Sequence, residues 1–223
     1  VFNHTGREFF AFRDIREHGS SSPYTGWYKG ISFDWRSPLG DAFGYEAWRG
    51  IWELPCLNLQ NPQVKEYLKD VIRFWISEFD IDGIRLDCAN VLDFQFMREL
   101  RLLAEEVKPD FWLMGEVIHG EYGRWVNSEM LHSVTNYEMH KSIYSAHNDH
   151  NYFELAHNVR RLQAIGRSLY TFLDNHDEDR IASKLKDPNH LKVIYTLLYT
   201  LPGIPSVYYG SEWGIEGRRT DSC

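Results

Sequence analysis

Three acidic side chains stand at the ends of short apolar runs, where carboxylates can reach a substrate. They are Asp87 in 82–87 (DGIRLD), Glu116 in 114–117 (MGEV) and Asp177 in 172–177 (FLDNHD). Cleavage of a glycosidic bond needs one carboxyl group that protonates the leaving oxygen and another that attacks or stabilises the anomeric carbon. A single carboxylate at a strand end is often only a helix cap. Three in succession predict a glycosidase site.

The neighbours of these carboxylates suggest their roles. Alternation along a strand places Arg85 and Asp87 on the same side, where the guanidinium keeps the carboxylate ionised, as a nucleophile must be. Glu116 ends an apolar strand, where burial favours the protonated form that a general acid needs. Asn175 and His176, in the third motif, are able to bind sugar hydroxyls.

Hydrophobic periodicity predicts the elements that hold these residues. Helices are expected over 62–79, 92–107, 141–162 and 190–201, and strands over 83–86, 111–117, 133–137, 169–173 and 206–209. Short strands that alternate with long helices indicate parallel pairing, in an open doubly wound sheet or a closed barrel. The sequence has no G-x-G-x-x-G turn, so the dinucleotide fold has no support. The fold class expected is α/β, a (β/α)8 TIM barrel, whose active sites lie where the carboxyl ends of the strands meet.

Residues 5–61 show no long period of either kind and are rich in Gly, Ser, Pro and aromatic residues. A loop this long inside a compact domain is either functional or a small subdomain. We interpret it as an excursion over an active site. Its aromatic rings can pack a core or stack on sugars, and Tyr45 and Trp48 are the preferred stacking candidates.

Composition and charge indicate which classes of partner are not expected. The 223 residues carry a net charge of −8, with positive and negative side chains interleaved, so a nucleic-acid partner is not expected. No apolar run reaches the roughly 20 residues of a membrane-spanning helix. Three cysteines do not make a disulfide framework and favour a reducing compartment, which is the sole basis for preferring the cytoplasm.

Two further groups of residues have ordinary interpretations. The histidines lack the tight spacing of a zinc site, so no catalytic metal is expected. Among them, His147 and His150 with Asp149 are interpreted as a solvated helix face. Cys88 is interpreted as a small core residue that points away from Asp87.

Together these motifs resemble the α-amylase family of glycoside hydrolases over nearly the whole chain. The family's four signatures and its eighth strand are matched by 1–4 (VFNH), 82–87, 115–116, 172–177 and 203–210 (GIPSVYYG). The resemblance implies that Asp87 is the nucleophile, Glu116 the acid/base and Asp177 the stabiliser of the transition state. It also implies contacts with the nucleophile or the sugar from His4, Arg85 and His176.

The subfamily signal is narrower. Residues 54–58 (LPCLN) and 87–90 (DCAN) resemble segments of neopullulanases, cyclomaltodextrinases and maltogenic amylases, whereas Val91 and Ile118 depart from that group. The resemblance implies retaining hydrolysis of α-1,4 bonds in starch-derived glucans, maltodextrins or cyclodextrins. Retention implies that the carboxyls of Asp87 and Glu116 lie about 5–5.5 Å apart. A transglycosylase, or a non-catalytic glucan-binding protein on the same barrel, remains an alternative.

The resemblance also implies a division of the chain. Residues 1–4 would end the third barrel strand, 5–61 would form the excursion, and 62–223 would supply strands four to eight with their helices. The first part of the barrel and the C-terminal β-domain would lie outside 1–223, so this segment alone is expected to be poorly soluble or inactive. Asn3 matches a position that some members use for structural calcium, and no other cofactor is expected. The family resemblance is compatible with a homodimer of the full-length protein.

Overall fold

The computed structural model describes residues 2–220, whose contacts divide the chain into two compact units, 1–113 and 114–223. The units divide within strand β4 (Trp112–Gly115), and residues 5–61 fall in the first unit. The excursion joins the first unit because its aromatic rings pack on the helix that follows. Phe9 and Trp27 both contact Tyr67, with ring centroids 5.8 and 5.4 Å away.

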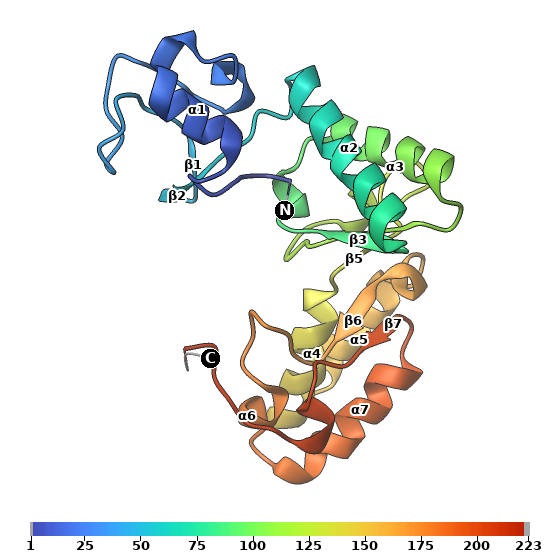
Figure 1. Ribbon diagram of the computed structural model, residues 1–223. Coiled ribbons are helices and arrows are strands. Elements are labelled where there is room, and N and C mark those ends of the chain that lie inside the picture. The colour runs from blue at the N-terminus through green and yellow to red at the C-terminus, as the bar shows by residue number, and fades with distance from the viewer. Residues whose placement is uncertain (1, 221–223) are drawn as a thin grey trace. The chain divides into compact units, whose positions relative to one another are not determined.

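The first unit contains three helices, a hairpin and a short strand (Figure 1). In chain order these are α1 (Phe10–His18), β1 (Ala47–Trp48), β2 (Ile51–Pro55), α2 (Pro62–Phe79), β3 (Gly83–Leu86) and α3 (Phe94–Val107). The sequence did not predict α1. Only three residues of this helix are buried, Ala11, Phe12 and Ile15. The side chain of Phe9, at the N-cap position, makes no capping hydrogen bond. The usual start signal of a helix is therefore missing.

The helices α2 and α3 pack on each other and begin where the side chains before them cap their first turns. The helix α2 has the predicted bounds, with Asn61 as N-cap and Pro62 in the first turn. Helix α3 begins at Phe94 rather than 92, because the Asp93 carboxylate accepts a hydrogen bond from the backbone amide of Phe96 at 2.8 Å.

Strand β3 lies against the start of β4. The amide of Trp112 donates to the carbonyl of Asp82 at 2.8 Å. A Cβ atom at Gly83 would lie 2.5 Å from the Trp112 carbonyl oxygen, so only glycine permits this approach. The strand that ends in Asp87 is thereby fixed in the first unit.

The second unit is built from consecutive strand–helix units. After the end of β4 come β5 (Ser133–Val134), α4 (Tyr137–Asn148), α5 (Phe153–Arg161), β6 (Tyr170–Phe172), α6 (Ile181–Lys184), α7 (Leu191–Thr200) and β7 (Ile204–Ser206). Both β4–β5 and β6–β7 are parallel, and a parallel bridge joins Thr135 to Tyr170. These strands neighbour one another in chain order. Helices connect β5 to β6 and β6 to β7, as in successive units of a (β/α) barrel, whereas the connection from β4 to β5 contains a short 3-10 helix.

Three predicted elements of this unit differ from the structure. The expected strand 133–137 stops at Val134, because the Asn136 side chain caps α4 through the Met139 amide. The expected helix 141–162 is two helices, 137–148 and 153–161, and His150 in the turn between them has φ +51°. The last strand lies at 204–206 instead of 206–209, and beyond it the Tyr208 ring packs on a guanidinium.

Apolar side chains from the helices, and Leu173 directly after β6, form a core in the second unit. One buried cluster comprises Met139, Ile143, Ala146, Leu155, Leu173, Ile181, Leu185, Ile194 and Leu198. Short 3-10 helices connect the elements of the chain at 19–21, 25–27, 89–91, 122–124, 166–168, 188–190 and 211–213.

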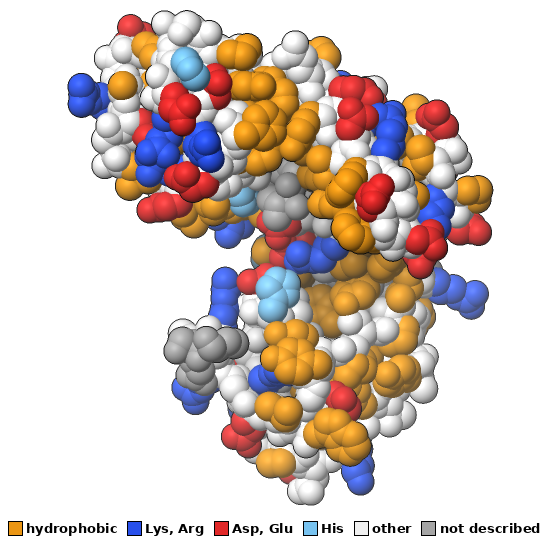
Figure 2. Space-filling view, in the orientation of Figure 1, with side chains coloured by type: hydrophobic (Ala, Val, Ile, Leu, Met, Phe, Trp, Pro, Cys, Tyr) orange, Lys and Arg blue, Asp and Glu red, His pale blue; other side chains and the backbone are white. Residues whose placement is uncertain are grey.

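On the surface shown in Figure 2, acidic and basic side chains are interleaved, as the sequence suggested. Among residues 2–220, none of the helices is both long and apolar enough to cross a bilayer.

Candidate active site

In the first unit, Asp87 directly follows β3 and has two polar neighbours on its own strand end. The guanidinium of Arg85 lies 3.5 Å from Oδ1, and the thiol of Cys88 donates to Oδ2 at 3.2 Å. Arg85 and Asp87 therefore share one side, as strand alternation predicts. The expectation for Cys88 was wrong: its backbone is left-handed, with φ +51°, and its half-buried side chain turns back to Asp87 instead of entering the core.

His4 and Trp48 form one flat surface in the same unit. Their rings stack with centroids 5.7 Å apart and an angle of 16°, and the Arg49 guanidinium lies 5.0 Å from the Trp48 ring centre. Burial lowers the pKa of His4, while the nearby Asp87 carboxylate raises it in part. A neutral imidazole at this position can both donate to and accept from a sugar hydroxyl.

The structure corrects the prediction for Tyr45. Its ring is 2 % exposed and packs among Phe12, Phe43 and Trp52, while its hydroxyl donates to the Trp52 carbonyl at 2.6 Å. Burial is the main reason why the pKa of Tyr45 is raised. The ring closes the core of the excursion and offers no face to a ligand. Trp48, half-buried, keeps a partly accessible surface.

Asn3, the predicted calcium ligand, is buried beside His4, with its amide nitrogen 3.2 Å from Nδ1 of the imidazole. Calcium takes roughly six to eight oxygen ligands. Asn3 supplies one side-chain oxygen, so it does not define a calcium site by itself.

In the second unit, Glu116 directly follows β4 and is 7 % exposed. Thr135, after β5, fixes the backbone beside it: its hydroxyl accepts from the Val117 amide at 2.9 Å and donates to the Val117 carbonyl at 3.0 Å. The hydroxyl of Tyr137 donates to Oε1 of Glu116 across 3.5 Å. The acid predicted from sequence is thus held at its strand end by residues of the next strand–helix unit.

Asp177 lies in the turn after β6, and the two other polar residues of its motif orient it. The Asn175 side-chain oxygen accepts from the Asp177 amide at 2.9 Å, and the His176 Nε2 lies 3.1 Å from the Asp177 carboxylate. Arg219 approaches the other carboxylate oxygen at 3.7 Å. His176 is exposed, so both the carboxylate and the imidazole are accessible to a ligand.

Asp174 holds this turn in place through hydrogen bonds of its carboxylate. Its carboxylate is buried and accepts two hydrogen bonds of 2.7 Å, from the Ile181 amide and from the Ser211 hydroxyl. Arg180 donates to the same Ser211 hydroxyl at 3.0 Å. The segment after β6 is therefore tied to the segment after β7, which fixes the position of Asp177.

A pocket of about 360 Å3 opens in the second unit beside Tyr137, and most of the residues that line it are aromatic or charged. The lining residues include Ile118, His119, Tyr137, His140, Tyr144 and Glu178. Within it His140 is buried and stacks on Phe172, with ring centroids 5.1 Å apart. Tyr137, which contacts Glu116, lines this pocket, whereas Glu116 itself does not.

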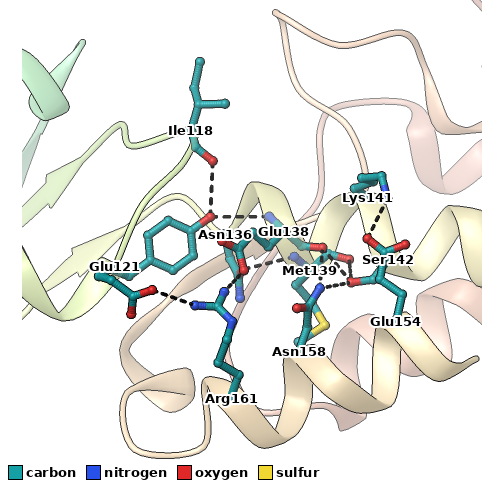
Figure 3. Close-up of polar contacts among 11 residues, drawn as sticks. Ile118, Glu121, Asn136, Glu138, Met139, Lys141, Ser142, Glu154, Asn158 and Arg161 are labelled. Carbon is teal, nitrogen blue, oxygen red and sulfur yellow. Dashed lines mark hydrogen bonds and ion pairs between the residues drawn. The ribbon is translucent and has the colours of Figure 1, made fainter.

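Figure 3 shows polar contacts among residues of the loop after Glu116 and of the helices α4 and α5. The Tyr122 hydroxyl donates to the Ile118 carbonyl and accepts from the Glu138 amide, each at 3.4 Å. Arg161 of α5 pairs with Glu138 of α4. Asn158, also of α5, donates to the Ser142 hydroxyl at 3.1 Å. The loop after Glu116 is thereby joined to both helices.

Glu178 directly follows Asp177, and the pKa of its carboxyl group is strongly shifted. Its pKa is lowered to about 2, first by the contact with His140 and then by Lys184, against the opposing effect of burial. The His140 Nε2 lies 3.6 Å away, and the Lys184 ammonium is the closer partner. The charged carboxylate is therefore favoured in the folded protein.

We expect replacement of Glu178 by Gln to lower the free energy of unfolding at pH 7 by about 1–2 kcal/mol, after allowance for partial exposure. The folded-state pKa lies below the ordinary 4.5, so this stabilisation is complete above about pH 4.5 and is lost as the pH falls through about 2. Thermal unfolding between pH 7 and 3 should show the difference shrink towards acid. Glu212→Gln, at an exposed position, is the control. A difference that does not change with pH would contradict this account.

His147 also departs from its prediction. It is 3 % exposed instead of solvated, and it packs against Tyr152 and His190 with ring centroids 5.3 and 5.0 Å away. Burial lowers its pKa. The sequence pattern placed His147 on a solvated helix face. The turn after α4 brings Tyr152 against the His147 ring and covers it.

Known proteins and a known family are similar to this chain in sequence. The family described as "Alpha amylase, catalytic domain" matches residues 1–222. Maltogenic alpha-amylase of Bacillus acidopullulyticus is 33 % identical over 234 residues, and neopullulanase 2 of Thermoactinomyces vulgaris is 34 % identical over 235 residues. Each alignment takes in 100 % of this chain and 39 % of the relative. The chain therefore spans about two fifths of the length of these curated relatives.

A solved structure is also similar to this chain over nearly its whole length. The ligand-free cyclic alpha-maltosyl-(1→6)-maltose hydrolase from Arthrobacter globiformis superposes with a TM-score of 0.89 at 29 % sequence identity. The match covers 99 % of this chain and 51 % of that chain. The likeness thus extends over almost every element described above.

Proposed function

Because this chain belongs to the α-amylase catalytic-domain family, we propose that the protein carrying it is a retaining α-glycosidase that hydrolyses α-1,4-glucosidic bonds. The substrates proposed are starch-derived glucans, maltodextrins or cyclodextrins. The family fold is a (β/α)8 barrel, and this chain is part of that domain. We propose that 1–4 ends its third strand, that 5–61 is the excursion, and that 62–223 supplies strands four to eight.

One observation carries the proposal. All three carboxylates of the family motifs are retained, and each lies at or just beyond the end of a short strand, held by named partners. Asp87 has Arg85 beside it, Glu116 receives the Tyr137 hydroxyl, and Asp177 is fixed through its own amide. A protein that only bound glucans would not need this complete set.

The proposed reaction has two displacements. Asp87 attacks the anomeric carbon as Glu116 gives its proton to the departing glycosidic oxygen, and the C–O bond breaks. Glu116, now a carboxylate, takes a proton from water, whose oxygen attacks the same carbon and releases Asp87. Asp177 accepts hydrogen bonds from the sugar ring while positive charge develops. The result is hydrolysis with retention of the α configuration.

Binding and specificity follow from the surrounding side chains. We propose that His4, Arg85 and His176 contact the nucleophile or the sugar at the cleavage subsite, and that Trp48 stacks on a glucose unit. The names of the relatives, maltogenic amylase, neopullulanase and cyclomaltodextrinase, support short glucans and cyclodextrins. No organic cofactor is proposed, and Asn3 remains a proposed calcium ligand.

Reducing-sugar release from maltoheptaose and β-cyclodextrin, measured on the protein that carries this chain, tests the proposal. Activity on either substrate that disappears in Glu116→Gln would support it, and the preferred substrate would indicate the subfamily. Product analysis in the presence of a maltooligosaccharide acceptor separates hydrolysis from transfer. A folded protein that turns over neither substrate would contradict it.

A further inference from the structure

A hydrogen-bonded bridge in the second unit joins the carboxylate of Glu116 to the backbone amide of Asp177 through the side chains of Tyr137 and Asn175. Asn175 Nδ2 donates to the Tyr137 hydroxyl at 3.1 Å, and the Tyr137 hydroxyl faces Glu116 Oε1 at 3.5 Å. On its other side, Asn175 Oδ1 accepts from the amide of Asp177. We propose that Tyr137 is a positioning residue that holds the carboxyl group of Glu116, through its Oε1 atom, in the orientation from which it gives its proton. This inference rests on the proposed function.

The direction of each hydrogen bond follows from the donors present. The Asp177 amide donates only, so it identifies the Asn175 atom beside it as the oxygen and turns the amide nitrogen towards Tyr137. That nitrogen also donates only, so the phenol oxygen accepts from it. The phenol proton is left to point at another acceptor, and Glu116 Oε1 lies there.

Tyr137 stays a donor over the working pH range. Burial is the main cause that raises the pKa of its phenol to about 12, with further contributions from nearby carboxylates. The phenol therefore remains protonated wherever a glycosidase of this kind would work.

The ring is held in place on several sides. It packs edge-on against Phe172, with centroids 4.9 Å apart, and edge-on against His140 at 6.3 Å. Tyr137 is also the first residue of α4, directly after the Asn136 cap. A separation of 3.5 Å is long for an O–H···O bond, and catalytic hydrogen bonds commonly shorten when substrate binds.

The Tyr137 hydroxyl donates to Oε1 while the carboxyl group gives its proton to the glycosidic oxygen. When that proton departs, negative charge appears on the carboxylate, and the Tyr137 hydroxyl stabilises it. A hydrogen bond donated to a carboxylate is stronger than one donated to a neutral carboxyl group. Removing the hydroxyl should therefore make the proton harder to lose.

The experiment compares Tyr137→Phe with the wild type in the protein that carries this chain. We expect kcat on maltoheptaose to fall about 10-fold, and the alkaline limb of the kcat/KM profile to move up by roughly 0.5–1 pH unit. Tyr152→Phe, which removes a phenol bonded to His147 elsewhere in the unit, should leave the profile unchanged. A lower kcat with an unmoved alkaline limb would overturn the proposal and leave Tyr137 a merely structural role.

A second variant tests the same hydrogen bond while it keeps the phenol hydroxyl. Site-specific incorporation of 3-fluorotyrosine at position 137 keeps the ring and makes the phenol a stronger donor, so the alkaline limb should move to lower pH. A shift in the same direction as in Tyr137→Phe, or no shift, would overturn the proposal. The proposed function is judged separately, by wild-type turnover and its loss in Glu116→Gln.

Discussion

Replacing Glu116 with Gln in the protein that carries this chain should lower kcat on maltoheptaose about 10³-fold, because general acid–base catalysis typically contributes 10²–10⁴-fold. Gln has nearly the shape of Glu but cannot give its proton to a glycosidic oxygen. The site around position 116 should keep its geometry, since Thr135 holds the adjacent backbone and not the carboxylate. Reducing-sugar release at substrate saturation measures the loss.

The loss should depend on the leaving group. Fluoride leaves without protonation, so α-maltosyl fluoride should still glycosylate Glu116→Gln rapidly, in a burst that is followed by slow turnover. Glu106→Gln, at an exposed position on α3, is the matched control and should behave as the wild type. An equal loss on maltoheptaose and on the fluoride would show that Glu116 is not the acid.

Replacing Asp87 with Asn should be at least as damaging, lowering kcat by about 10⁴-fold or more on both substrates, as losses of a catalytic nucleophile commonly do. Asn cannot form the glycosyl ester, so an activated leaving group does not help. The contrast with Glu116→Gln separates nucleophile from acid. The measurement is kcat on maltoheptaose and on α-maltosyl fluoride, side by side.

Azide provides a control for this prediction. In Asp87→Gly the side chain is removed, so a small external anion has space to attack the anomeric carbon of α-maltosyl fluoride directly. A single displacement gives the β-configured azide. Recovery of the α-configured azide, or an Asp87→Asn variant with near wild-type activity, would contradict the role assigned to Asp87.

Sequence was sufficient where local patterns decide the structure. The bounds of α2 follow from its period and from Asn61 and Pro62 at its start, and the structure confirms them. The common side of Arg85 and Asp87 follows from strand alternation. The family membership was also accessible, since each motif is continuous in the chain.

Sequence failed where tertiary contacts decide. The helix α1 lacks a capping signal and gains its stability from aromatic packing of Phe12 with Tyr28 and Tyr45. Tyr45 appeared available for stacking because nothing in the sequence shows that its ring is enclosed. Its burial depends on partners from three separate segments of the excursion.

Thr135 and Tyr137 were missed for a related reason. Their side chains act on the segment after β4, so their roles exist only once β5 pairs beside it. The signal in the sequence is a polar cluster, Thr135-Asn136-Tyr137, at the end of a short apolar run. In a parallel sheet such a cluster belongs to the same edge as Glu116, and this could have marked these residues as neighbours of the acid.

The most direct test of the account is to trap the glycosyl-enzyme. Glu116→Gln treated with α-maltosyl fluoride should accumulate a covalent maltosyl adduct, because the base that activates water for its release is missing. Peptide mass spectrometry should place the adduct on Asp87. An adduct on Asp177 or on any other residue, or β-maltose as the first product of the wild-type protein, would contradict a retaining mechanism with Asp87 as its nucleophile.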